Sequence, residues 1–321
     1  MKKLRIALYK MEPQYENHAI EQMRIYYTEK GHDVEDYIPL KNALYDKIYC
    51  SSIFTFTQKD HLLIDERWEC GGTGFNIIKH LPPEIESRRI YKDFGWTQRG
   101  CNNNCSFCVV PLKEGCAQVV GDIYDIWSRK NRKITLYDNN ILQLPDHFVR
   151  MCEQIRKENL KVDWNQGLDI RLLDNDIADM LGSLAHAEYH FAFDHSGLDK
   201  VVESKVEILK NHGINRNTFY VLVGCKDRPG KTAKEDIEDA LYRLNLLKSL
   251  GQNAYVMRYR KVTENQPETL ITKWTEKLYI PIANWGSIHL AFHGMDFFKD
   301  YLVHERGKSY KKYFDEIGIV G

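Results

Sequence analysis

Three cysteines within eight residues constrain this chain more than any other feature. Cys101, Cys105 and Cys108 follow the spacing C-x3-C-x2-C. A loop of this length can direct three thiolates toward three irons of a cubic 4Fe-4S cluster and leave the fourth iron open. A structural zinc site normally takes a fourth ligand from a second cysteine or histidine pair, and none lies near this loop in the sequence. We expect a 4Fe-4S cluster; a zinc knuckle and three unrelated buried thiols are the alternatives.

Composition and charge narrow the class of protein. The 321 residues include 45 basic and 45 acidic side chains, so no overall charge draws the chain to nucleic acid or to an anionic membrane. The apolar run among the first residues is too short for us to expect a signal peptide there, and no apolar run reaches membrane-spanning length. We expect a cytoplasmic protein without membrane association. The other five cysteines are scattered, which indicates reduced thiols and not a disulfide framework: Cys50, Cys70, Cys116, Cys152 and Cys225.

The first 85 residues predict a small parallel sheet. Strand patterns cover 4–9, 32–37 and 47–53, and a helical pattern covers 17–30, where Gly31 is well placed to end the helix. Strand, helix and strand at this spacing favour a Rossmann-like domain over residues 1–85. The breaker segment 81–85, with two prolines, reads as a linker.

Residues 86–265 predict six strand–helix units. The expected strands are 94–98, 134–137, 162–166, 189–193, 219–223 and 253–257. The expected helices are 122–130, 145–158, 175–184, 198–212 and 233–250. Right-handed crossovers of this kind build a partial (β/α)6, TIM-like barrel, and chemistry in such barrels sits at the carboxyl ends of the strands. The first strand leads directly into the cysteine loop, so we expect the cluster at that rim.

Residues 266–321 predict a helical C-terminal extension. A helical pattern covers 268–278, and aromatic residues and lysines alternate in the tail. Such a tail can bind nucleic acid, but the chain lacks the overall basic excess of a nucleic-acid binder. We expect an amphipathic cover for the barrel.

The cysteine motif, Phe107 just before its last cysteine, and the six-fold strand–helix order together resemble the radical S-adenosylmethionine (radical SAM) superfamily over roughly residues 90–265. The resemblance implies an enzyme that cleaves S-adenosylmethionine reductively at a 4Fe-4S cluster. It also implies a 5'-deoxyadenosyl radical that abstracts hydrogen from a substrate, and a one-electron donor such as flavodoxin or ferredoxin. The substrate stays open among small molecules, nucleotides and macromolecules. Whether S-adenosylmethionine is consumed or regenerated stays open as well.

The resemblance also implies site residues. Cys101, Cys105 and Cys108 would ligate the cluster. Seven residues would contact S-adenosylmethionine: Phe107, Asp138, Asn140, Asn165, Gln166, Asp169 and Arg171. Asp138 and Asn140 stand where the superfamily often has Gly-Gly-Glu, and a plain core role for Phe107 or an exposed salt bridge for Arg171 is an open alternative. Asp194, His195 and Cys225, at the ends of the fourth and fifth strands, are candidates for substrate binding or proton and hydrogen transfer. A structural histidine at 195 and a thiol that only fills space at 225 are the alternatives.

The N-terminal domain resembles the cobalamin-binding type that precedes the barrel in one branch of the superfamily. That branch centres on an Asp-x-His-x-x-Gly loop, which this chain lacks, since His18 and His32 lie in another context. We therefore expect no cobalamin. Cobalamin-dependent methyl transfer and a non-catalytic iron–sulfur or zinc protein are the alternatives. Methylthio transfer to RNA is disfavoured, because that branch needs a further cysteine-ligated cluster and Cys50 and Cys70 are too few.

Overall fold

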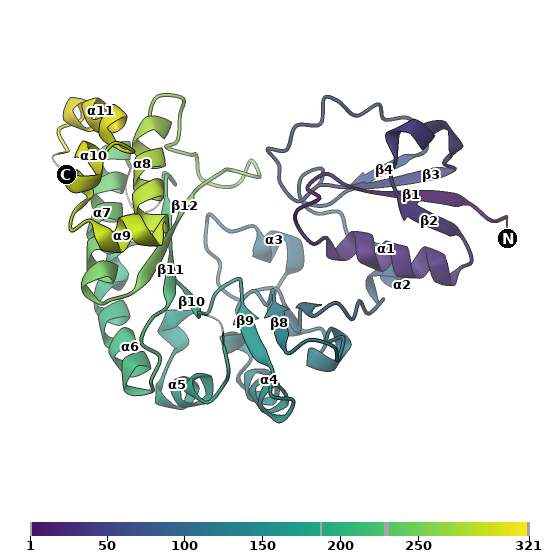
Figure 1. The fold of residues 1–321 in the computed structure, drawn as a ribbon, viewed down its shortest axis with the longest axis horizontal. Coiled ribbons are helices and arrows are strands. Elements are labelled where there is room, and N and C mark those ends of the chain that lie inside the picture. Colours follow the sequence, from purple (N-terminus) through teal and green to yellow (C-terminus); the bar gives the residue numbers. More distant parts are fainter. Residues whose placement is uncertain (1, 187, 228–230, 320–321) are drawn as a thin grey trace. The chain divides into compact units, whose positions relative to one another are not determined.

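The structure is a computed structural model that describes residues 2–186, 188–227 and 231–319. Contacts divide it into two compact units (Figure 1). The first comprises residues 1–95 with 124–128, and the second comprises 96–123 with 129–321. Within the described residues, no helix is long and apolar enough to cross a membrane.

The first unit is built on a four-stranded parallel sheet in the order β2-β1-β3-β4. Its elements are β1 (Arg5–Lys10), α1 (His18–Glu29), β2 (Asp33–Asp36), η1 (Pro39–Leu44), β3 (Lys47–Ser51), β4 (Trp68–Gly71), α2 (Pro83–Glu86) and β5 (Phe94–Gly95). The three strands and the helix expected from the sequence are present. The fourth strand, β4, was not expected, because only four residues form it and no alternation marks it.

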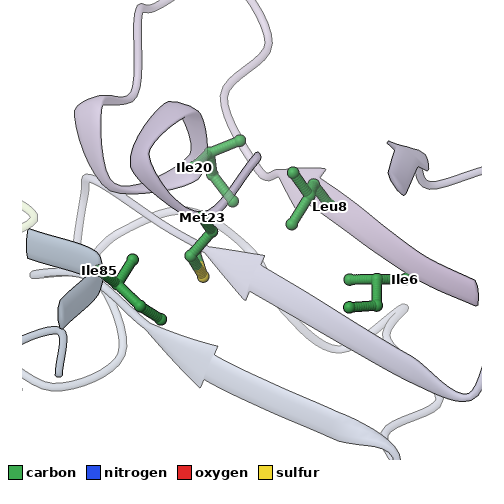
Figure 2. Close-up of a cluster of buried hydrophobic side chains, with 5 residues drawn as sticks. All are labelled: Ile6, Leu8, Ile20, Met23 and Ile85. Atoms are coloured by element: carbon green, nitrogen blue, oxygen red, sulfur yellow. The ribbon is translucent and has the colours of Figure 1, made fainter. Parts of the chain in front are cut away.

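The core of this unit follows from alternation along β1. Ile6 and Leu8 point to one face, where Ile20 and Met23 of α1 and Ile85 of α2 cover them (Figure 2). The intervening residue, Ala7, packs on the opposite face with Tyr45 and Ile48. Both faces of the sheet are therefore buried, which parallel sheets require.

The second unit carries the cysteine loop and the remaining strands. Its elements up to the last strand are β6 (Gln98–Arg99), α3 (Val110–Glu114), β7 (Gln118–Val119), β8 (Lys133–Leu136), η3 (Ile141–Gln143), α4 (Pro145–Lys157), β9 (Lys161–Trp164), η4 (Ile170–Leu172), α5 (Asn175–Gly182), β10 (His190–Ala192), η5 (Ser196–Leu198), α6 (Asp199–Asn211), β11 (Thr218–Val223), α7 (Ala233–Ser249) and β12 (Asn253–Arg258). The C-terminal elements are α8 (Glu276–Ser287), α9 (His289–Gly294), α10 (Phe298–Val303), η6 (Lys308–Tyr310) and α11 (Lys311–Glu316).

Parallel pairing organises the strands of this unit. β8 pairs with β9, and β11 pairs with both β10 and β12, all in parallel. Isolated parallel bridges, Val162 to His186 and Leu168 to Phe191, join the two groups. Helix α7 packs against β11 and α8 against β12 (Figure 1). The structure is thus an α/β fold with parallel sheets, as expected, and strands β8 to β12 lie where the sequence patterns predicted them.

Three expectations were wrong. The expected helix 122–130 contains only the short turn η2 (Ile123–Asp125), because the carboxylate of Asp93 accepts from the backbone N and the hydroxyl of Ser128 at 2.7 and 2.8 Å. Arg129 then takes a left-handed φ of 63°. These contacts fix an extended turn in place of a helix.

The expected strand 94–98 is broken into β5 and β6, because the backbone N–H groups of Thr97 and Gln98 donate to Asp138 instead of to a neighbouring strand. The expected helix 268–278 is also misplaced. Leu270 donates its backbone N–H to the carbonyl of Gly224 at 2.7 Å, so the segment pairs with the end of β11, and the helix, α8, begins only at Glu276.

Candidate functional site

The cysteine loop begins at Gly100, where only glycine fits. Gly100 has a φ of +77°, and a Cβ atom there would collide with the carbonyl oxygen of Cys116. Its backbone N donates to the side-chain oxygen of Asn139, just after β8, at 2.9 Å. The loop is therefore anchored to the end of a strand at its first residue.

The three cysteines of the loop are partly buried. The backbone N of Cys108 donates to the carbonyl of Cys105 at 3.0 Å, which closes a tight turn between them. Burial raises the pKa of the Cys105 thiol, and the charges of Asp194 and Cys108 raise it further. Burial also raises the pKa of Cys108, where Cys101 and Asp194 contribute in the same direction. The three sulfurs and Asp194 thus lie within electrostatic reach of one another.

The three thiols of the loop are candidate cluster ligands by their spacing. Among residues 2–186, 188–227 and 231–319, no group of three histidine, cysteine or acidic side chains that could hold a metal ion is found. A 4Fe-4S cluster takes each thiolate on a separate iron, and three thiols on one short loop can supply three of them.

Asp169 ties the cysteine loop to the segment after β9. Its Oδ2 accepts from the side-chain N of Asn103, within the loop, at 2.9 Å. Its two oxygens also accept from Nε and Nη2 of Arg171 at 2.8 and 2.6 Å. Burial alone would raise the pKa of Asp169, but these hydrogen bonds outweigh it and lower the pKa. Asp169 therefore stays ionised and holds both partners.

Asp138 lies behind the loop in a fully buried network. Its carboxylate accepts from the backbone N of Thr97 and Gln98 and from the hydroxyl of Thr97, at 2.6, 2.9 and 2.8 Å. Nε2 of His147 lies 3.0 Å from that hydroxyl, and Nδ1 lies 2.9 Å from Arg150. Because Arg150 can only donate, His147 carries its proton on Nε2. Burial raises the pKa of Asp138 to about 6, and the network fixes the segment that leads into the loop.

Asn140 differs from Asp138 in having an unsatisfied atom. The residue is 4% exposed, and its Oδ1 is buried without a hydrogen-bond partner among the residues that the structure describes. Its Nδ2 reaches Asp169 at 3.5 Å, and its backbone N donates to Gln98 at 3.1 Å. A buried acceptor without a donor beside the cysteine loop suits a ligand that brings an N–H group.

The remaining candidates occupy different surroundings. Asn165 and Gln166 are exposed, and the carbonyl of Asn165 accepts from the hydroxyl of Tyr220 at 2.7 Å. The charge of Asp194 raises the pKa of the Cys105 and Cys108 thiols, and His195 directly precedes the turn η5. Cys225 is fully buried, away from solvent.

Phe107 packs against the buried cluster of Leu222, Cys225 and Tyr259. Its carbonyl accepts from the side-chain N of Gln266 at 2.7 Å. Gly224 directly follows β11 and packs against the side chain of Ile271, because a Cβ atom on Gly224 would collide with that side chain. The segment after β12 therefore covers this end of the cysteine loop.

Sequence reasoning missed Asn103, Asn139 and Gln266, which hold the loop. The contacts from Asn103 and Gln266 join residues 66 and 159 positions apart, so no local pattern reveals them. The one available signal was the run of three asparagines at 102–104, because side-chain amides commonly hydrogen-bond within loops.

Comparisons with known proteins agree with the motif. No protein-family profile matches the chain. A segment of 70 residues, 20% of the chain, is 33% identical to the tRNA-2-methylthio-N(6)-dimethylallyladenosine synthase of Paracoccus denitrificans. A segment of 49 residues, 13% of the chain, is 39% identical to the enzyme of the same name from Flavobacterium johnsoniae. These segments span only 16% and 10% of those relatives.

The fold is similar to that of a solved structure, the radical S-adenosylmethionine methyltransferase TsrM from Kitasatospora setae with cobalamin and a [4Fe-4S] cluster bound. The TM-score is 0.57 at 11% identity, over 81% of this chain and 73% of TsrM. The expected resemblance to radical SAM enzymes is confirmed. The expectation that cobalamin is absent has no support, because this neighbour in fold binds it.

Proposed function

We propose that this chain is a radical SAM enzyme that binds a 4Fe-4S cluster through Cys101, Cys105 and Cys108. It would cleave S-adenosylmethionine reductively, giving a 5'-deoxyadenosyl radical that takes hydrogen from a substrate. One observation carries the proposal: the three thiols share a single short loop that Gly100 and Asn103 tie to the ends of two parallel strands. A cluster held there lies at the edge of the sheet where α/β enzymes bind their ligands.

The protein's part in this reaction is to hold and orient. Asn140 is our candidate for the amino group of S-adenosylmethionine, because its buried Oδ1 lacks a donor. Exposed Asn165 and Gln166 are candidates for the ribose or the carboxylate. Asp138 and Asp169 would not contact S-adenosylmethionine but would hold the loop in place, since their carboxylates already accept hydrogen bonds from the chain. The cofactor supplies the radical chemistry, and the protein supplies position and shelter from water.

The proposed function also assigns a role to each domain. We propose that the parallel strands β8 to β12 act as part of one open barrel, with residues 86–265 as the catalytic domain and 266–321 as its cover. The electron would come from a one-electron donor such as flavodoxin or ferredoxin. Residues 1–85 would form an accessory, Rossmann-like domain whose ligand the sequence does not identify.

Methyl transfer with cobalamin is the second candidate, and the likeness to TsrM favours it. The likeness covers 81% of the chain, and the residues that it leaves uncovered are fewer than those of the first unit. The likeness therefore includes part of the first unit. Two histidines of the first unit are already engaged within the chain. Nδ1 of His32 accepts from the backbone N of Leu4 at 3.2 Å, and the ring of His18 packs against Phe94.

The experiment that tests the leading proposal is spectroscopic. Protein reconstituted with iron and sulfide without oxygen is reduced and examined by electron paramagnetic resonance, with and without S-adenosylmethionine. The proposal expects a reduced 4Fe-4S signal that changes when S-adenosylmethionine is added, and no such signal in Cys105→Ala. Tight, stoichiometric binding of cobalamin by the same protein would favour the second candidate. A signal that S-adenosylmethionine leaves unchanged would contradict the leading one.

A further inference from the structure

A polar and aromatic strip runs across one face of strands β9 to β12. Alternate residues on these strands, such as Phe191, Val221 and Val256, are buried on the face that α7 and α8 cover. The residues between them point to the opposite face, because successive side chains of a strand alternate. That face carries Asp163, His190, Tyr220, Tyr255 and Met257 in order across the strands.

Asp163 and His190 are neighbours in this strip. Nδ1 of His190 lies 4.0 Å from Oδ1 of Asp163, and the side chains are 18% and 16% exposed. Both atoms are buried, and neither has a hydrogen-bond partner within the described ranges. The other carboxylate oxygen of Asp163 lies 3.4 Å from Nζ of Lys133. Buried polar atoms are rarely left unpaired, so a small shift that joins Nδ1–H to Oδ1 satisfies both.

Tyr220 holds the same imidazole from its flat side. The two rings are stacked, with centroids 5.4 Å apart and planes at 12°. The hydroxyl of Tyr220 is tethered in turn, since it donates to the carbonyl of Asn165 at 2.7 Å. Burial first and then the charge of Asp163 raise the pKa of Tyr220 to about 12, so its hydroxyl stays protonated. The stacked ring of Tyr220 thus limits the tilt of the His190 imidazole.

Nε2 is the nitrogen of His190 that remains available. Nδ1 is buried and lies 4.0 Å from Oδ1 of Asp163, which leaves Nε2 as the ring nitrogen for a ligand. Beyond Tyr220, the strip continues into Tyr255 and Met257. The rings of Tyr255 and Tyr220 meet edge to face, with their centroids 6.0 Å apart. Tyr255 and Met257 are 51% and 45% exposed, which is high for large apolar side chains on a sheet face. A fixed acceptor therefore stands beside an open apolar surface.

We propose that His190, with its proton held on Nδ1 by Asp163, binds the substrate through Nε2, and that Tyr255 and Met257 receive an apolar or aromatic part of the same molecule. The assignment rests on the proposed function, since it makes this face of the strands the substrate face. It names the substrate class as a small molecule with an O–H or N–H donor next to a planar or apolar group. Asp163 acts as a positioning residue, because it reaches the substrate only through His190.

Nuclear magnetic resonance of the full-length chain, labelled with ¹⁵N-histidine, tests the tautomer. His190→Gln identifies the signals of His190. The wild type is expected to show the proton on Nδ1 at pH 8. Asp163→Ala is expected to move the proton toward Nε2, whereas Tyr220→Phe, which keeps the stacked ring, leaves it on Nδ1. A wild-type proton on Nε2, or no change in Asp163→Ala, would overturn the role of Asp163.

A pair of matched probes tests the binding site. Phenol carries an O–H donor on an aromatic ring, and anisole is the same ring with the donor methylated. Phenol is expected to shift the Nε2 signal at millimolar concentration and to bind about fivefold more tightly than anisole, as one hydrogen bond of about 1 kcal/mol requires. Equal effects of the two probes, or no effect of phenol, would overturn the assignment even if a variant fails to fold.

These readouts need no cleavage of S-adenosylmethionine, so they separate two failures. If S-adenosylmethionine is not cleaved but the tautomer of His190 and its response to phenol are as expected, the binding face is supported and the proposed function is wrong. If the cluster chemistry is present but phenol leaves Nε2 unchanged, only the substrate face is wrong.

Discussion

The side-chain amide of Asn103 donates a hydrogen bond of 2.9 Å to the carboxylate of Asp169, and this contact joins the cysteine loop to the segment after β9. The loop is short and lies at the edge of the parallel strands, so it depends on a few long-range contacts for its shape. The same carboxylate binds Arg171, which keeps it ionised and strengthens its hydrogen bond to Asn103.

Loss of this contact is expected to loosen the cluster. Asn103→Ala removes one hydrogen bond of about 1 kcal/mol, which corresponds to roughly fivefold faster loss of iron to a chelator. The measurement is the rate of iron release from reconstituted protein. Asp176→Asn, in the first turn of α5, serves as the control and is expected to release iron at the wild-type rate. Equal rates for Asn103→Ala and the wild type would show that the contact does not hold the loop.

Gly100→Ala is expected to disrupt the loop more severely. An alanine there meets both a φ of +77° and the carbonyl oxygen of Cys116. Gly115→Ala is a matched control, because Gly115 also has a positive φ, +72°, but has open space where its Cβ would lie. The positive φ lowers the free energy of unfolding of each variant by about 1–3 kcal/mol, and only Gly100→Ala adds a collision. Thermal unfolding and iron content are measured; similar losses in the two variants would exclude the collision.

Asp236 is expected to make stability depend on pH. It is fully buried, its Oδ2 accepts from the backbone N of Gly224 at 2.7 Å, and burial raises its pKa to about 7. A raised pKa favours the folded state while the carboxyl is protonated. Its contribution is complete below pH 4 and is lost as the pH rises through 7, by an amount on the order of a few kcal/mol.

The measurement is the urea midpoint of the wild type and of Asp236→Asn between pH 5 and pH 8. The variant cannot ionise at this position, so the difference between the two proteins isolates the titration of Asp236 from that of other groups. The wild type is expected to lose stability relative to the variant over this range. A difference that stays constant with pH would mean that Asp236 does not titrate there.

His147 is expected to act with the opposite sign. Burial first and then Arg150 lower its pKa to about 4, so the folded protein holds the imidazole neutral. Its contribution to stability is present above pH 6.5 and is lost as the pH falls toward 4, because only the unfolded chain gains a proton in that interval. Unfolding of His147→Gln between pH 4.5 and pH 7 is expected to show a shallower decline than the wild type. Parallel declines would contradict the assignment.

The sequence predicted the parts of the fold that local patterns determine. The strands β8 to β12 carry apolar residues on their buried faces, such as Ile134, Val162 and Phe219, and the helices between them show helical spacing. The helix expected at 122–130 does not form, because the backbone N of Ser128 donates a hydrogen bond to Asp93, a residue 35 positions away. The three cysteines stand out in the sequence because they lie within eight residues, whereas Asn103 and Gln266 act across 66 and 159 positions.

The substrate face was missed for a different reason. The prediction placed functional residues at the ends of strands, and Asp163 and His190 lie within β9 and at the start of β10. Each looks like an ordinary strand residue until the register of the sheets brings them together. Two isolated bridges reveal the pair: Val162 of β9 pairs with His186, just before β10, and Leu168, after β9, pairs with Phe191 of β10.

The formation of 5'-deoxyadenosine tests the central claim most directly. Protein reconstituted without oxygen is reduced with dithionite, mixed with S-adenosylmethionine and analysed by liquid chromatography, beside Cys105→Ala and beside Cys152→Ala, which removes a buried thiol outside the loop. We expect 5'-deoxyadenosine from the wild type and from Cys152→Ala, and none from Cys105→Ala. Protein isolated with zinc in place of iron, or equal product from wild type and Cys105→Ala, would contradict the account.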